Sequence, residues 1–207
     1  MGGGRIGSKV VAAIVAILVV ASFAQAMFLH AVSAQPSTDW PMFRFNQERT
    51  GTTENVTPPL ELAWSYMTYN FLESSPAVSG DFVYIGVGVS GGTTKWGVYA
   101  FDATNGTLRW NFTTENQCES SPAVSGGIVY VGSDDMNLYA LNASTGSKVW
   151  NYTTLGFVRS SPVVASGRVY VESDDSNVYC LDASSGALVW NYTTKNGGDS
   201  SPAVIGG

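Results

Sequence analysis

Charged side chains recur at two positions of a repeating pattern in this 207-residue chain. One position stands directly before a Ser-Ser-Pro triplet and holds Glu73, Glu119, Arg159 and Asp199; the other holds the consecutive aspartates Asp134-Asp135 and Asp174-Asp175. Loops held by a rigid scaffold commonly carry binding residues, and carboxylates also ligate calcium. The alternatives are solvated charges at loop ends and, for the paired aspartates, ordinary turn chemistry. These residues form the candidate binding rim.

Residues for catalysis are sparse. The single histidine, His30, lies in an apolar N-terminal segment, so the sequence holds no histidine-based triad and no histidine metal cluster. Cys118 and Cys180 are an even pair, which invites a disulfide in an oxidising compartment. Their expected places, a loop and a strand one repeat apart, favour two unpaired thiols instead. The sequence therefore predicts no catalytic residue, no metal site and no cofactor.

The elements that would position the rim come from an internal repeat. Pro122, Pro162 and Pro202 of the Ser-Ser-Pro triplets are 40 positions apart, and Pro76 precedes Pro122 by 46. Each complete copy ends in a tryptophan. A period near 40 residues is typical of architectures whose units bury their apolar faces against stacked neighbours.

Each copy contains four short runs rich in Val, Ile, Tyr, Trp and Thr, separated by Gly, Asn, Asp and Ser. The middle runs are apolar on both faces, which favours small sheets packed between similar sheets. Four antiparallel strands per unit are what a β-propeller blade requires. We therefore predict an all-β partial propeller ring of about three and a half blades, at about 74–113, 120–153, 160–193 and 200–207.

The segment Ala100–Trp110 resembles the tryptophan-docking motif of pyrroloquinoline-quinone-like (PQQ-like) repeat propellers, Ala-x-Asp-x-x-Thr-Gly-x-x-x-Trp. The motif returns at Ala140–Trp150 and Cys180–Trp190, and Asp39–Arg44 resembles the mature start of secreted members. The resemblance covers residues 39–207 approximately, and within the family the chain is similar to the exported outer-membrane assembly propellers. A quinone dehydrogenase of this family would be expected to show an adjacent cysteine pair and a calcium site, which this sequence lacks.

The repeated tryptophans have a structural interpretation. An indole buries a large area and needs an acceptor for its N–H, which a neighbouring blade's backbone can supply. We therefore expect blade docking by Trp64, Trp110, Trp150 and Trp190 with the turn glycines Gly106, Gly146 and Gly186.

The N-terminus reads as an export signal. Arg5 and Lys9 precede the apolar run from Val10 to Ala24, and small-residue cleavage sites follow, the second ending at Ala34. We predict a hydrophobic export helix in residues 1–34, cleaved as a signal peptide or retained as a membrane anchor, then an extended lead-in over 35–59 and the repeats over 60–207.

The net negative charge of the chain argues against some classes of binding partner. Removal of 1–34 leaves eight basic and sixteen acidic residues, a net charge of −8. Nucleic acid and anionic lipid would need a basic patch, so the sequence predicts neither as the main partner, and membrane contact only through an uncleaved N-terminal segment. A protein or glycan partner at the cell surface is expected for an exported chain.

Sequons for N-glycosylation are frequent, at Asn55, Asn105, Asn111, Asn142, Asn151 and Asn191. Pro58 follows the Asn55 sequon closely and weakens it, leaving five candidates. Three of these occupy one repeat position on the expected outermost strand. Inheritance through the repeat is the alternative explanation.

The leading hypothesis is a non-catalytic exported or cell-surface propeller that acts as a binding or assembly scaffold, in an N-terminal fragment of a longer protein. The alternatives are the N-terminal part of a PQQ-dependent oxidoreductase and a membrane-anchored sensor ectodomain.

Overall fold

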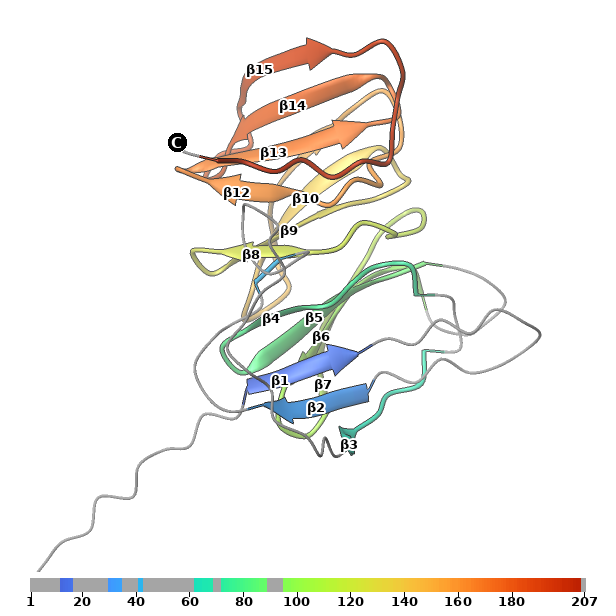
Figure 1. Cartoon of the computed structure of the whole chain (residues 1–207), viewed down its shortest axis with the longest axis vertical. Coiled ribbons are helices and arrows are strands. Elements are labelled where there is room, and N and C mark those ends of the chain that lie inside the picture. The colour runs from blue at the N-terminus through green and yellow to red at the C-terminus, as the bar shows by residue number, and fades with distance from the viewer. Residues whose placement is uncertain are drawn as a thin grey trace, which may run out of the picture.

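The computed structural model (Figure 1) describes residues 41–42, 62–68, 72–88 and 95–205, together with the backbone of two strands upstream, β1 (Ala12–Ala16) and β2 (His30–Ala34). Every regular element in these ranges is a β-strand. None of the described residues belongs to a helix of the length and apolar character needed to cross a membrane.

Three four-stranded antiparallel sheets follow one another in chain order and stack along the long axis of the molecule (Figure 1). Strands adjacent in sequence are adjacent in each sheet, so each blade runs up and down from its inner to its outer strand. The all-β class and the four-strand repeat are thereby confirmed. The blades are β4 (Ala77–Ser79), β5 (Phe82–Val87), β6 (Gly97–Asp102) and β7 (Leu108–Thr113); β8 (Ala123–Ser125), β9 (Ile128–Gly132), β10 (Asn137–Asn142) and β11 (Lys148–Thr153); and β12 (Val163–Ala165), β13 (Arg168–Ser173), β14 (Asn177–Asp182) and β15 (Leu188–Thr193).

The turn between the third and fourth strands explains why Asp or Asn recurs there. In the first blade, Asp102 Oδ1 accepts hydrogen bonds from the backbone N–H groups of Thr104 (2.9 Å) and Asn105 (3.1 Å). Asn142 and Asp182 accept the equivalent bonds in the next two blades. These side-chain turns bring the outer strand back beside the third one at the same place in every blade.

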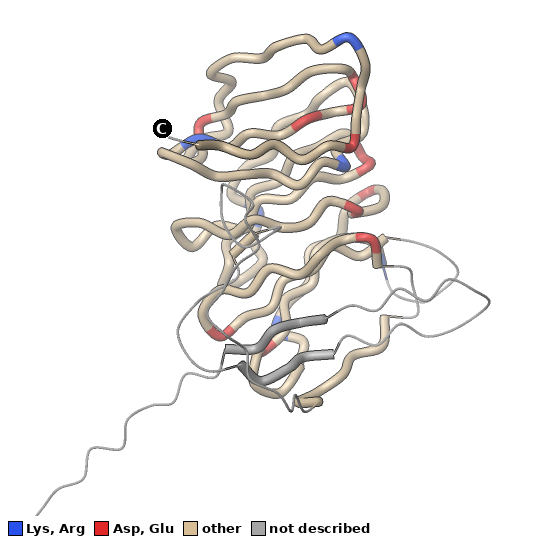
Figure 2. Tube along the Cα trace, viewed as in Figure 1, with Lys and Arg blue, Asp and Glu red and all other residues tan. Residues whose placement is uncertain are grey.

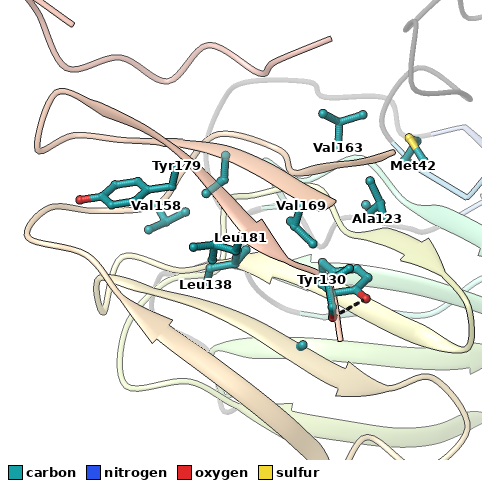
Figure 3. Packing of buried hydrophobic residues seen from close by; sticks show 13 residues of the cluster. Met42, Ala123, Tyr130, Leu138, Val158, Val163, Val169, Tyr179 and Leu181 are labelled. Carbon is teal, nitrogen blue, oxygen red and sulfur yellow. Dashed lines mark hydrogen bonds between the residues drawn. The ribbon is translucent and has the colours of Figure 1, made fainter. Parts of the chain in front are cut away.

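The core lies between the blades. The third strand of the first blade, β6, is buried at every position. One apolar cluster joins the first blade to the second, and another joins the second to the third (Figure 3). Figure 3 also shows Met42, from the lead-in, beside Ala123 and Val163 of the inner strands β8 and β12, and Pro41 O accepts the Val124 N–H at 2.6 Å. Stacking thus buries both faces of the middle strands, as their continuous apolar runs indicate.

A tryptophan joins each blade to the next. The indole Nε1 of Trp64 donates to Ala103 O (2.9 Å), that of Trp110 to Ala143 O (2.9 Å) and that of Trp150 to Ala183 O (3.1 Å). The ring lies against the turn glycine of the next blade: a methyl group on Gly146 would be 2.6 Å from Cε3 of Trp110, and Gly106 and Gly186 are equally close to Trp64 and Trp150. A side chain larger than hydrogen at the turn would therefore separate the blades.

Tyrosines in the second strands reinforce this joint. Tyr84 Oη donates to Ala143 O (3.2 Å) and Tyr130 Oη to Ala183 O (3.0 Å), the same carbonyls that accept from the tryptophans. Trp190 and Tyr170 of the third blade keep the corresponding ring contact, with centroids 6.0 Å apart, while Trp190 is 45% exposed.

The export helix is wrong for the two parts of that segment that the structure describes. β1 and β2 are antiparallel strands, and β2 pairs with β3 (Leu62–Trp64) to form a three-stranded sheet. β-Branched residues in the middle of β1 favour an extended backbone, and the edge of β3 offers unpaired N–H and C=O groups. Of the two cleavage sites, the second (residues 32–34) falls in β2, whereas the first (residues 24–26), the rest of 1–34 and most of the lead-in lie outside the described residues.

The fourth copy begins against the third blade without forming a strand in the described residues. Ser201 Oγ accepts the Ser161 N–H at 2.9 Å, and Val204 packs on the cluster between the second and third blades.

Candidate binding rim

Buried serines hold the loop ends that carry the rim residues. Ser74, Ser120 and Ser160, the first serines of the triplets, are at most 2% exposed. Ser160 Oγ accepts the Glu172 N–H (2.8 Å) of its own second strand, and Ser74 Oγ accepts the Gly86 N–H (3.0 Å). The residue just before each triplet is therefore fixed at one end of its blade, beside the loop between the second and third strands.

The second serine of each triplet links blades. The backbone N–H of Ser75 donates to Ser121 Oγ (2.8 Å), that of Ser121 to Ser161 Oγ (3.2 Å) and that of Ser161 to Ser201 Oγ (2.9 Å). This line of hydrogen bonds runs across the inner strands of successive blades. Sequence reasoning assigned it no role, although the signal was present in the unbroken Ser-Ser-Pro of all four copies.

Arg159 is the centre of the rim. Its Nε lies 3.0 Å from Asp134 Oδ1 and its terminal NH2 lies 2.8 Å from Asp134 Oδ2, a bidentate pair between the third blade and the second. Glu119 Oε2 lies 3.3 Å from Arg159 Nε, and Asp174 Oδ2 lies 3.8 Å from its NH1. The guanidinium also sits 4.8 Å above the ring centre of Phe157. Because the Asp134 side chain is only 4% exposed, this pair is largely shielded from water.

Two further acids extend the cluster across the blades. Burial and the charges of Asp134 and Glu73 raise the pKa of Glu119 to about 7, although Arg159 opposes the shift. A side-chain hydrogen bond with Glu73 of the preceding repeat contributes to it. Burial and the charge of Asp199 likewise raise the pKa of Asp174. An elevated pKa means that these carboxyls hold protons in the folded protein more readily than in the unfolded chain.

The two aspartates of each Asp-Asp pair make different contacts. Asp134 and Asp174, the first of each pair, face Arg159. Asp135 and Asp175 instead accept hydrogen bonds from the hydroxyls of Tyr139 (2.7 Å) and Tyr179 (2.6 Å) and from backbone N–H groups. Burial would raise the pKa of Asp175, but the hydrogen bonds from Tyr179, Leu155 and Asn177 outweigh it and lower that pKa. The second aspartates are therefore turn residues, the alternative considered for both.

Figure 2 shows acidic residues recurring along one side of the stacked blades. The structure brings together six of the eight rim residues, Glu73, Glu119, Asp134, Arg159, Asp174 and Asp199, and keeps Asp135 and Asp175 apart from them. Three carboxyls thus contact one guanidinium, and the carboxyls of Glu73 and Asp199 interact with two of these three, those of Glu119 and Asp174. Such an arrangement can bind a charged group and can hold a proton near neutral pH.

Metal ligation and thiol chemistry find little support in the described part of the chain. There, no three His, Cys, Asp or Glu side chains lie close enough together to hold a metal ion. Cys118 and Cys180 are both buried and free, and burial strongly raises the pKa of the Cys118 thiol. Cys118 packs in the cluster between the first and second blades, whereas Cys180 lies on β14 of the third, and the disulfide considered from the sequence is not formed.

Solved structures similar to this chain are propellers. BamB from Moraxella catarrhalis matches with a TM-score of 0.56 and 22% identity, and the match covers 90% of this chain and 51% of the BamB chain. A europium-containing methanol dehydrogenase matches with a TM-score of 0.65 and 21% identity, covering 77% of this chain and 32% of its own. Quinohemoprotein alcohol dehydrogenase from Comamonas testosteroni matches with a TM-score of 0.66 and 23% identity, and the match covers 78% of this chain and 28% of the dehydrogenase. At these identities the likeness shows the fold, and no curated protein matches the chain.

The chain spans about half the length of the BamB structure and about a third of each dehydrogenase. The model of a protein family described as outer membrane protein assembly factor BamB matches residues 94–206, more than half of the chain. The chain therefore belongs to the BamB-like family of PQQ-repeat β-propellers.

Proposed function

We propose that this chain is part of a non-catalytic, exported β-propeller that binds a protein partner at the cell surface through its rim. The observation that carries this proposal is the cluster around Arg159, to which four successive repeats contribute side chains. The blades beneath it are rigidly joined through tryptophans and serines, whereas the loops above them differ from copy to copy. A rigid scaffold with variable loops suits recognition.

The charge of the rim indicates the chemistry of the partner. Five carboxyls and one guanidinium in the rim favour a partner surface that carries basic side chains, because complementary potentials speed association and select partners.

Export is supported by the N-terminal segment, in which positive residues are followed by an apolar run and then by small-residue cleavage sites. Determination of the mature N-terminus tests it: a start near Gln35 means cleavage, and an intact N-terminus favours the membrane-anchored sensor.

The binding role is tested by photo-cross-linking in the native host. A benzoylphenylalanine at Gln117, in a rim loop, should form an adduct with an exported protein. The same group at Ser166, in the turn at the opposite end of the blade, should not. Glu119→Lys combined with the Gln117 probe should reduce the adduct several-fold. Equal adducts from both positions, or none from Gln117, would refute the proposal.

The oxidoreductase remains a second candidate because the methanol dehydrogenase and the quinohemoprotein alcohol dehydrogenase give higher TM-scores than BamB. The residues present do not fit the adjacent cysteine pair expected beside a quinone, since Cys118 and Cys180 are buried in different blades. Full-length protein mixed with pyrroloquinoline quinone and Ca²⁺, then separated by gel filtration, distinguishes the two: a chromophore that co-elutes with the protein favours the oxidoreductase.

A further inference from the structure

The outermost strand of every described blade carries the same exposed sequon. Asn111 lies on β7, Asn151 on β11 and Asn191 on β15, each followed two residues later by a threonine. In β7 and β11 these two side chains are exposed while the aromatic residues that alternate with them are half-buried. The three asparagines therefore stand on the outer edge of the stack, away from the blade interfaces.

A structural reason for the Asn-x-Thr pattern exists in two of the blades. Asn137 Oδ1 accepts hydrogen bonds from Asn151 Nδ2 (2.9 Å) and Thr153 Oγ1 (2.7 Å) on the neighbouring strand. Asn177 accepts from Asn191 and Thr193 in the same way, at 3.5 and 2.7 Å. This side-chain bridge alone would account for Asn and Thr in the second and third blades.

The first blade lacks that bridge and still has the pattern. Gly97 stands opposite Thr113, in the register position that Asn137 holds opposite Thr153. Glycine has no side chain to accept from Asn111 or Thr113, and both are exposed. The Asn-x-Thr sequence is therefore present where the bridge cannot explain it.

The other two described sequons have a local explanation. Asn142 Oδ1 accepts the turn N–H groups of Ser144 and Thr145, and the same turn position holds Asp102 and Asp182 in the other blades. An acceptor is needed there, whether Asp or Asn. Asn105 lies in the corresponding turn and accepts the Thr107 N–H, and its position holds Thr145 and Ser185 in the other copies.

We propose that Asn111, Asn151 and Asn191 are N-glycosylated, and that Asn105 and Asn142 are not. The donor class is an oligosaccharide linked through phosphate to a lipid. Transfer forms a bond from the asparagine Nδ2 to C1 of the first sugar and breaks the bond between C1 and the lipid-phosphate oxygen. The amide nitrogen gives up one proton, and the lipid phosphate leaves. This inference rests on the exported location proposed above.

A glycan on each outer strand also has a physical consequence. β7, β11 and β15 are the outer edges of their sheets, with backbone groups that could pair with another chain. A bulky polar group there blocks edge-to-edge association. The three glycans would lie along one edge and leave the rim loops open.

Mass spectrometry of peptides from protein isolated from the exported fraction of its native host tests the inference. Glycan mass additions are expected at Asn111, Asn151 and Asn191, with Asn105 and Asn142 unmodified. The first blade offers a matched pair of variants at Thr113, because this residue makes no side-chain bridge to Gly97 whose loss could change stability. Thr113→Ala should remove the glycan from Asn111, Thr113→Ser should retain it, and the urea midpoint of both unglycosylated chains should equal that of the parent.

Unmodified Asn111, Asn151 and Asn191 in the exported protein, or modification of the turn asparagines instead, would overturn the inference and leave the proposed function standing. Recovery of the protein only from the cytoplasm would overturn export itself, and the glycans with it.

Discussion

Replacing Arg159 with methionine should destabilise the protein in a manner that depends on pH. The substitution keeps much of the apolar side chain over Phe157 and removes the guanidinium that Glu119, Asp134 and Asp174 face. Breaking a buried ion pair costs about 3–5 kcal/mol, and an exposed pair contributes at most about 1 kcal/mol. Asp134 is 4% exposed and Arg159 31%, so we expect a loss between these limits, about 2–3 kcal/mol at pH 8.

The loss should shrink as the pH falls. Arg159 opposes the rise in the Glu119 pKa, so in its absence that pKa moves above 7. An acid whose folded pKa exceeds its unfolded value makes folding more favourable at low pH and loses that contribution as pH rises through the folded pKa. Protonation near pH 5 therefore relieves the repulsion that the variant suffers at pH 8.

Urea unfolding at pH 5 and pH 8 measures this difference. Arg168→Met is the matched control, because Arg168 pairs with Asp182 at 2.6 Å while their side chains are 39% and 32% exposed, so its loss should be under about 1 kcal/mol at pH 8. If Arg159→Met lost the same free energy at both pH values, or no more than the control at pH 8, the electrostatic account of the rim would be wrong.

Three further predictions concern the joints between blades, each measured by urea unfolding. Trp110→Ala should cost about 3–5 kcal/mol, because it removes a packed indole and its hydrogen bond, whereas Trp190→Ala, at a 45% exposed position, should cost much less; equal losses would contradict the docking role. Gly146→Ala should destabilise more than Gly126→Ala, since both have positive φ but only the first would place a methyl group against an indole, so similar losses would mean that backbone strain alone matters. Ser121→Ala should cost about 1–3 kcal/mol, because it leaves the Ser75 N–H without its acceptor; an unchanged midpoint would show that the serine line contributes little.

Much of the fold could be predicted because it is local and repeated. The 40-residue period, the β-branched runs and the turn residues Asp102, Asn142 and Asp182 act within one blade, where neighbours in sequence are neighbours in space. The docking role of the tryptophans could also be predicted from the sequence, because a large indole at a fixed place in each copy has to bury its ring and satisfy its N–H in the next copy. The N-terminal helix was wrong at the two described parts of that segment, β1 and β2, because apolar content does not distinguish a helix from a strand that pairs with an open edge.

The candidate rim was only partly predictable. The sequence placed Glu73, Glu119, Arg159 and Asp199 at one end of the blades, but it treated both aspartates of each pair alike. Both aspartates of a pair lie in the turn between the second and third strands, and their separation depends on the hydroxyl of Tyr139 or Tyr179 and on backbone N–H groups, which hold the second carboxylate away from the rim.

The amino-acid sequence by itself determined what each repeat becomes: four antiparallel strands, a side-chain turn and a tryptophan directed to the neighbouring copy. Only the tertiary structure decided which charges meet. Arg159 makes its bidentate pair with Asp134, 25 positions earlier, and only a longer contact of 3.8 Å with Asp174 of its own blade, because the stacking of one blade on the next sets the distance between their loops. Periodicity follows from residue order, whereas pairing across blades follows from how the blades pack.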